Sequence, residues 1–342
     1  GRIGFGGFES KEGGLAGNTI ESMSVAANET VIVHSGQVSA KVVNTTGQKA
    51  GAQLAASPLS AGQTYVRFTR IYVYFPSGDL PSIDNPINQG GTVREQAAGN
   101  YHAPVIIVTS SGTLKAGIMN LDLVSIEQSS SASSAAITVD NWHFIEMQYT
   151  ISVNGAGTSA ILTVNDIRLD GQTLGLTTTQ TYGTDASSLN FSSANGNISG
   201  WLIGYPLESK IIYLDDYALN DDQGGNQNSW PGEGKIVLLL PISDNARDTL
   251  WKGGAGGTTN LYDAVNNTPP IGTATETDLT QIEHAGGAAG TTDRYDANMT
   301  TYATAGIAAV DTISLMQFIE VDGEDIATGA KLLNFEVLSN PV

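Results

Sequence analysis

The residues best suited to chemistry lie where an apolar run ends. Asp215 and Asp216 follow the run at residues 211–214, and Asp221 and Asp222 come a short way further along. Carboxylate oxygens are ligands of Ca²⁺, which takes roughly six to eight oxygens. The four aspartates are therefore a candidate calcium site, although the stretch lacks the dense oxygen spacing of a dedicated calcium loop. The alternative is that one carboxylate accepts backbone hydrogen bonds in a turn while the other is solvated.

The acids do not form the pair that glycan hydrolysis requires. Jelly-roll glycoside hydrolases use two carboxylates about 5 to 9 Å apart, which on one strand means acids two or four residues apart. Asp215 and Asp216 are adjacent, so regular strand geometry would point them to opposite faces, and the apolar run at residues 142–151 carries only Glu146. The sequence therefore predicts no catalytic residues and a protein that is not an enzyme, with a glycan hydrolase as the least favoured alternative.

Aromatic side chains could stack on sugar rings. Trp142 and Trp201 begin apolar runs and are predicted to lie in the core, because large aromatic residues are usually mostly buried. Trp230 lies in a Trp-Pro-Gly turn and, together with Tyr205, is the candidate for ligand binding. The alternative is that this turn anchors a junction between domains.

Composition narrows the remaining chemistry. Cysteine is absent, which excludes thiol catalysis and zinc-thiolate sites, and the four histidines show no metal-ligand spacing. The net charge is -19, from 15 Lys and Arg against 34 Asp and Glu. Binding to nucleic acid needs clustered basic residues, so no nucleic-acid partner is expected. No apolar run approaches the roughly 18 residues of a membrane helix, so no membrane insertion is expected.

The pattern of apolar residues predicts an all-β protein. Charged residues make up only 14% of the 342 residues and 40 are glycine, which is typical of turn-rich β structure. Short runs with strand-like composition or alternation occur at residues 38–43, 65–75, 105–109, 114–118, 121–126, 142–151, 159–164, 201–205, 211–214 and 236–240. Residues 81–100 are polar and are predicted to form a long surface loop. The low-complexity run at residues 129–136 is predicted to be a flexible tip.

The amino-acid composition changes after Pro241, where Gly, Thr and Asn become frequent. We therefore expect two domains, at residues 1–240 and 241–342. Strand-like runs return only at residues 312–321 and 331–338. A sandwich that stops on a strand would be incomplete, so we expect the chain to continue or a neighbouring subunit to supply the rest.

Five motifs in the first domain resemble, in their order, the concanavalin A-like jelly roll and especially its laminin-G-like branch. They are GFES at residues 7–10, HSGQVSAKVV at 34–43, DNWHFIEMQYTIS at 140–152, ILTVNDIRLDG at 161–171 and IIYLDDYALND at 211–221. The resemblance implies an N-terminal jelly-roll sandwich, followed by a second, smaller β-sandwich domain.

The stretch at residues 229–251, followed by Tyr262-Asp263, Pro269-Pro270 and residues 293–302, looks like a type of tailed-bacteriophage virion protein. That resemblance implies a non-enzymatic structural protein on the virion surface, assembled in the host cytoplasm. It would act by contacts with capsid or tail subunits, as capsid decoration or a head or tail component, and as a homo-oligomer. The alternative is a lectin-like adhesin that binds host-surface polysaccharide. No cofactor is expected apart from the candidate Ca²⁺.

Overall fold

The computed structural model describes the chain in segments. These are residues 2–6, 26–36, 39–43, 59–91, 93–94, 100–121, 125–183, 210–225, 227–235, 241–247, 251–253, 282–284 and 295–299. All regular elements in these segments are strands, and none of these segments forms a helix long and apolar enough to cross a bilayer.

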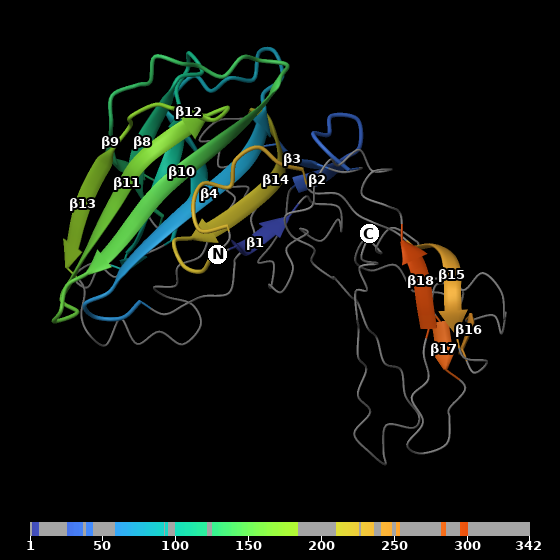
Figure 1. Cartoon of the computed structure of the whole chain (residues 1–342). Coiled ribbons are helices and arrows are strands. Elements are labelled where there is room, and N and C mark those ends of the chain that lie inside the picture. The colour runs from blue at the N-terminus through green and yellow to red at the C-terminus, as the bar shows by residue number, and fades with distance from the viewer. Residues whose placement is uncertain are drawn as a thin grey trace.

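A large antiparallel sheet forms one layer of the protein (Figure 1). Its strand order is β12-β11-β10-β4-β14-β3-β2, while β13 also pairs with β11 and β1 with β14. The bounds are β1 Arg2–Gly6, β2 Ala26–Glu29, β3 Ser39–Val43, β4 Thr64–Tyr74, β10 Trp142–Val153, β11 Ser159–Leu169, β12 Gln172–Thr173, β13 Thr178–Gly183 and β14 Ile211–Asp221. The long strands β4, β10 and β14 form its centre.

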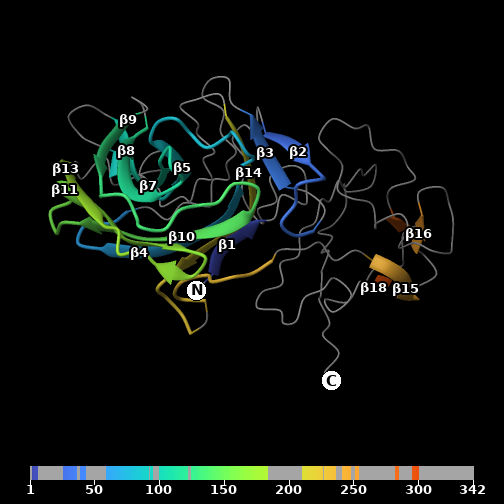
Figure 2. The ribbon, with the colours of Figure 1, turned by 90° about the horizontal axis from the view of Figure 1, so that it is seen from above.

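A smaller antiparallel sheet packs on one face of the large sheet, as Figure 2 shows from above. Its order is β5-β7-β8-β9, with β6 also paired to β7. The bounds are β5 Asn85–Gln89, β6 Val93–Arg94, β7 Tyr101–Val108, β8 Leu114–Asn120 and β9 Ser125–Ser129. The predicted all-β sandwich is therefore confirmed for the described part of the chain.

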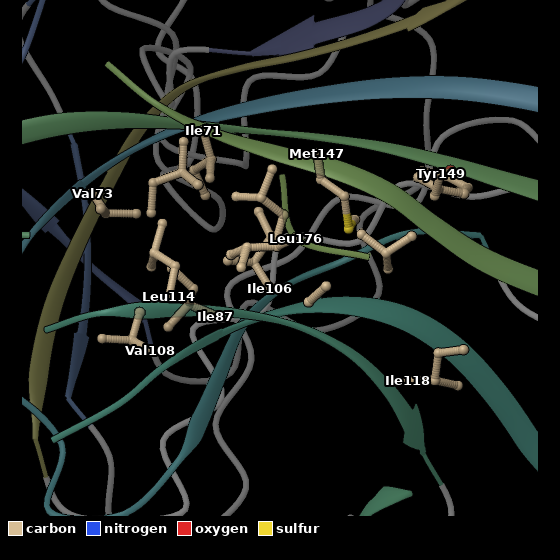
Figure 3. Packing of buried hydrophobic residues seen from close by; sticks show 14 of the residues in the cluster. Ile71, Val73, Ile87, Ile106, Val108, Leu114, Ile118, Met147, Tyr149 and Leu176 are labelled. Carbon is tan, nitrogen blue, oxygen red and sulfur yellow. The ribbon is translucent and has the colours of Figure 1, made fainter. Parts of the chain in front are cut away.

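The core lies between the two sheets because side chains alternate across each strand. In β4 the inward residues are Ile71 and Val73, and in β10 they are Ile145, Met147 and Tyr149, all fully or almost fully buried. They pack on small-sheet residues such as Ile106, Val108, Leu114 and Ile118, as shown in Figure 3. The residues that alternate with these, such as Arg70, Tyr72 and Tyr74 in β4 and Trp142, Phe144 and Glu146 in β10, face away from the small sheet and form what we call the outer face.

A polar cluster links the two sheets near one edge of the sandwich. Glu127 of β9 accepts a hydrogen bond from the Tyr182 hydroxyl of β13, and its Oε2 lies 2.8 Å from His102 Nδ1 of β7. The rings of His102 and Tyr182 stack with centroids 3.8 Å apart. This cluster joins β7 and β9 of the small sheet to β13 of the large one.

Four further strands lie outside these two sheets. β15 (Pro241–Arg247) pairs with β18 (Tyr295–Met299), and β16 (Trp251–Gly253) pairs with β17 (Ile282–His284). The division into domains at residues 1–240 and 241–342 stays a prediction. The runs predicted at residues 201–205, 236–240, 312–321 and 331–338 lie outside the described residues.

Two predicted loops have more structure than the sequence indicated. Residues 81–100 contain β5 and β6, because Ile87 and Val93 insert into the core despite their polar neighbours. The serine-rich run at residues 129–136 is not a free tip. Ser130 and Ser133 accept hydrogen bonds through Oγ from the backbone N–H groups of Ala116 and Leu114, at 3.0 and 2.8 Å. Their hydroxyl groups thus provide acceptors for two backbone N–H groups of β8.

The turn between β7 and β8 depends on a glycine. Gly112 has a φ of 76°, and a Cβ there would lie 2.7 Å from the carbonyl oxygen of Ile137. We expect Gly112→Ala to lower the free energy of unfolding by about 2 kcal/mol, since both the left-handed backbone and the contact oppose a side chain. Denaturant unfolding measures this. Gly155→Ala is the control, because its Cβ would meet nothing within 4 Å, and equal losses in the two variants would contradict the expectation.

Candidate functional site

The outer face carries a grid of aromatic and charged side chains. The register of β4 and β10 pairs Tyr74 with Trp142, Tyr72 with Phe144, and Arg70 with Glu146. On the far side of β10, Arg168 of β11 lies opposite Glu146. Aromatic pairs therefore occupy one end of these strands, and a row of two guanidinium groups and a carboxyl group crosses the sheet beside them.

The aromatic end forms a connected set of rings. The Trp142 and Tyr74 centroids are 5.6 Å apart, and Tyr74 lies 5.7 Å from Tyr213 of β14. Tyr72 and Phe144 are 5.5 Å apart. We call these five rings the aromatic platform. Tyr74, Trp142 and Phe144 are only partly buried, so they offer ring surface to a ligand.

His34 connects the aromatic platform to the paired aspartates. Its ring stacks on Tyr72 with centroids 3.6 Å apart and meets Trp142 edge-on at 5.7 Å. Its Nδ1 lies 2.5 Å from Asp216 Oδ2. The side chain of Asp216 is fully buried, whereas that of His34 is partly exposed. His34 is thus held by Asp216 at the margin of the platform.

Asp215 and Asp216 both accept hydrogen bonds from the segment around His34. This is contrary to the prediction that they point to opposite faces. Asp215 Oδ2 accepts hydrogen bonds from the backbone N–H groups of His34 and Ser35, at 3.0 and 3.3 Å. Asp216 accepts a hydrogen bond from Ser35 Oγ at 2.8 Å. The reason is a β-bulge, where the β14 register to β4 shifts between Asp215 and Ala218 and Asp216 adopts a φ of 46°.

Burial has an electrostatic consequence for this pair. Loss of solvation, followed by the charge of Asp216, raises the pKa of Asp215 to about 9 despite the backbone N–H groups that it accepts from. Burial and the neighbouring carboxyl group therefore favour the protonated form of Asp215. A second buried carboxyl group, Glu146, also has a raised pKa, mainly because of desolvation.

A strap formed by residues 229–234 crosses the charged row. Gly232 N–H donates to Glu146 Oε1 at 2.6 Å, and Arg70 Nη1 donates to the Gly232 carbonyl at 2.8 Å. At its two ends, Asn220 Nδ2 donates to the Ser229 carbonyl at 2.7 Å and Gly234 N–H to the Tyr72 hydroxyl at 3.3 Å. These contacts hold the strap against the charged row, beside the aromatic platform.

Trp230 belongs to this strap and is only partly exposed. Its ring meets Phe68 edge-on, with centroids 5.5 Å apart, and the Arg168 guanidinium carbon lies 4.0 Å from its centroid. Trp230 therefore packs on the outer face. Trp142, predicted to lie in the core, lies on the outer face, because the inward positions of β10 begin at Ile145. Tyr205 and Trp201 fall outside the described residues.

The candidate calcium ligands are not gathered into one site. Asp221 ends β14 and accepts a hydrogen bond from Gln223 N–H, while exposed Asp222 accepts one from Gln223 Nε2. Asp215 and Asp216 are engaged with His34 and Ser35, as described above. Within the described segments no three His, Cys, Asp or Glu side chains group in a way that could hold a metal ion.

The fold and its outer face define an all-β sandwich with a partly exposed aromatic face. Neither a protein-family model nor the sequence of a curated protein matches this chain. Solved structures of similar fold include an endo-β-1,4-glucuronan lyase from the fungus Trichoderma reesei, with 12% identity over 64% of this chain and 95% of that one and a TM-score of 0.40. Alginate lyase vAL-1 from Chlorella virus has 10% identity over 57% and 88%, with a TM-score of 0.34. The cellulose-induced protein Cip1 has 15% identity over 61% and 88%, with a TM-score of 0.36.

These likenesses concern the fold alone, and they correct one expectation. The sequence analysis predicted a protein that is not an enzyme, partly because a hydrolase motif is missing. That prediction is wrong as drawn, because polysaccharide lyases are among the structures with a similar fold. The likeness assigns no activity to this chain. The comparisons also give no link to a bacteriophage particle.

Several residues of the outer face escaped the sequence analysis, namely Arg70, Tyr72, Phe144 and Arg168. A usable signal was present in β4, where Arg70, Tyr72 and Tyr74 occupy every second position beside inward Ile71 and Val73. Alternation of that kind separates a core face from a second face. The contact between His34 and Asp216 had no comparable signal, since 182 residues separate the two along the chain.

Proposed function

We propose that the sandwich binds carbohydrate on the aromatic platform of its outer face. The observation that carries this proposal is the partial exposure of three neighbouring rings, those of Tyr74, Trp142 and Phe144, on rigid central strands. The apolar faces of sugar rings stack on aromatic side chains, which hold their orientation without a large entropy cost when their strands are fixed.

Polar groups stand beside these rings, as recognition of sugar hydroxyls requires. Asp140 Oδ1 accepts hydrogen bonds from the Tyr74 hydroxyl at 3.4 Å and from Ser77 N–H at 2.9 Å. The partly exposed imidazole of His34 also contacts Trp142, edge-on. A ligand on Trp142 would thus have a carboxylate and an imidazole within reach.

This function corresponds to the lectin-like alternative of the sequence analysis. A glycan-binding surface would suit an adhesin, and the predicted location on a virion, with capsid or tail subunits as partners and a homo-oligomeric state, remains a separate prediction.

The proposal predicts the effect of removing one ring. We expect Trp142→Ala to weaken binding of the best ligand from a panel of neutral and acidic oligosaccharides about tenfold, since one aromatic contact contributes about 1 kcal/mol or more beyond its area. Calorimetric titration of the full chain measures this, and product analysis of the same samples detects cleavage.

Ile161→Ala is the matched control, because Ile161 is an exposed apolar side chain of β11 away from the platform. Thermal unfolding of both variants verifies that the fold is retained. Unchanged affinity in a folded Trp142→Ala variant, or an equal loss in Ile161→Ala, would refute the platform as the binding site.

A further inference from the structure

Arg168 has an unusual set of contacts for a half-buried arginine. Its Nε is buried and makes no hydrogen bond within the described part of the chain. It forms no ion pair there either, although Glu146 is its partner across the strands. The contact that fixes its guanidinium is the stack on Trp230, with 4.0 Å between the guanidinium carbon and the ring centroid. Such a stack restrains the plane of the guanidinium and leaves its N–H donors unused.

Trp230 is itself held in place, so the stack is built on a fixed support. Its ring packs against Phe68, and the strap around it is tied down by Glu146 and Arg70 through Gly232 and by Asn220 through Ser229. Arg168 is therefore presented at the surface by a prearranged neighbour, which lowers the entropy cost of binding a ligand.

The other charged groups of this region are already engaged. Arg70 is buried and donates to the backbone carbonyls of Asp216 and Gly232. Asp166 Oδ1 accepts hydrogen bonds from the backbone N–H groups of Ile167 and Gly175. Glu146 lies beneath the strap with its carboxyl oxygen on Gly232 N–H, and burial raises its pKa. Arg168 is the cation of this row whose hydrogen-bond donors are not satisfied by the described residues.

We propose that Arg168, stacked on Trp230, binds the carboxylate of an acidic sugar residue, so that the ligand of the outer face is an anionic polysaccharide. The inference rests on the proposed function and adds its substrate class. The planar fork of a guanidinium matches a planar carboxylate with two parallel hydrogen bonds. Arg168 lies opposite Glu146, four residues along β10 from Trp142, which corresponds to roughly 13 Å. A chain of several sugar units could therefore contact both.

The overall charge of -19 makes this inference more specific. An acidic protein gives a polyanion no long-range attraction, so binding must depend on local, charge-assisted hydrogen bonds. Removing one such group should then have a large effect on an acidic ligand and little on a neutral one.

The test compares oligogalacturonate with its methyl ester, which has the same sugars without the charge. We expect the acid to bind at least about tenfold more tightly, and Arg168→Gln to abolish that preference while binding of the ester is unchanged. Arg168→Lys should restore only part of it, because an ammonium lacks the fork. Lys235→Gln, which removes an exposed cation directly after the strap, should have no effect. The indole N–H signal of Trp230 in NMR spectra should shift with galacturonate and stay in place with galactose.

Equal affinity for acid and ester, with both reduced by Trp142→Ala, would overturn the acidic-sugar inference and leave the proposed function standing. A preference for the acid that persists in folded Arg168→Gln would also overturn it. If neither oligomer binds and galacturonate does not shift the Trp230 signal, the inference fails as well. The proposed function itself then depends on the wider oligosaccharide panel with the Trp142→Ala variant.

Discussion

Replacing Asp216 by alanine is expected to lower the free energy of unfolding by about 3 kcal/mol. The carboxylate is fully buried and is the partner of both His34 Nδ1 and Ser35 Oγ. Its loss would remove a hydrogen-bond partner from each of these two groups, and a buried polar group that loses its partner costs about 1 to 3 kcal/mol. The change should also release the His34 ring and thereby weaken glycan binding at the neighbouring Trp142.

Equilibrium unfolding in urea measures the first effect, and oligosaccharide titration the second. Asp222→Ala is the matched control, because that carboxylate is exposed and contacts the adjacent Gln223 side chain. We expect Asp222→Ala to change the free energy of unfolding by less than about 0.5 kcal/mol. A similar small change for Asp216→Ala would show that the His34 contact does not stabilise the fold.

The second large effect is a loss of stability as the pH rises. The pKa of Asp215 is raised to about 9 in the folded protein, against an ordinary value of 3.8. Between these two values the folded state binds a proton that the unfolded state has released, so the free energy of unfolding decreases with increasing pH. The slope contributed by one group is at most about 1.4 kcal/mol per pH unit. The raised pKa of Glu146 acts in the same direction.

Urea midpoints measured from pH 5 to pH 9 test this expectation. Wild-type protein should unfold at progressively lower urea concentration as the pH increases, and Asp215→Asn should have a flatter profile because its side chain does not titrate. A wild-type stability that increases over this range would mean that Asp215 is ionised in the folded state, contrary to the expected direction.

The sequence predicted the strands that have a clear apolar pattern. Residues 65–75 and 142–151 correspond closely to β4 and β10, because alternation or dense apolar composition reports burial directly. It missed β5, whose sequence NPINQ has one apolar side chain between polar ones. Tertiary context determined the structure of that segment, since Ile87 fills the core and the backbone pairs with β7.

The candidate site was predicted less well than the fold. Trp230 does lie on the outer face, yet Trp142 was assigned to the core and the aspartate pair to opposite faces. The first error comes from the general tendency of large aromatic residues to be buried, and the second from assuming a regular strand. The bulge in β14 and the left-handed backbone of Asp216 turn two adjacent carboxyl groups toward one loop. No residue type in that stretch indicates this backbone conformation. The contacts between strap and sheet are also formed between residues distant in sequence.

The pairing order of the large sheet sets a limit on how soon this protein can fold during synthesis. The central strand β4 needs β14 as a neighbour, and β1 pairs with β14 through Arg2 and Asn220. Roughly 150 residues separate the end of β4 from the end of β14. At typical rates of about 5 to 20 residues per second, a ribosome needs roughly 7 to 30 seconds to make them. During that interval one edge of β4 has no strand partner, so the nascent chain is exposed to misassembly and high contact order should make folding slow.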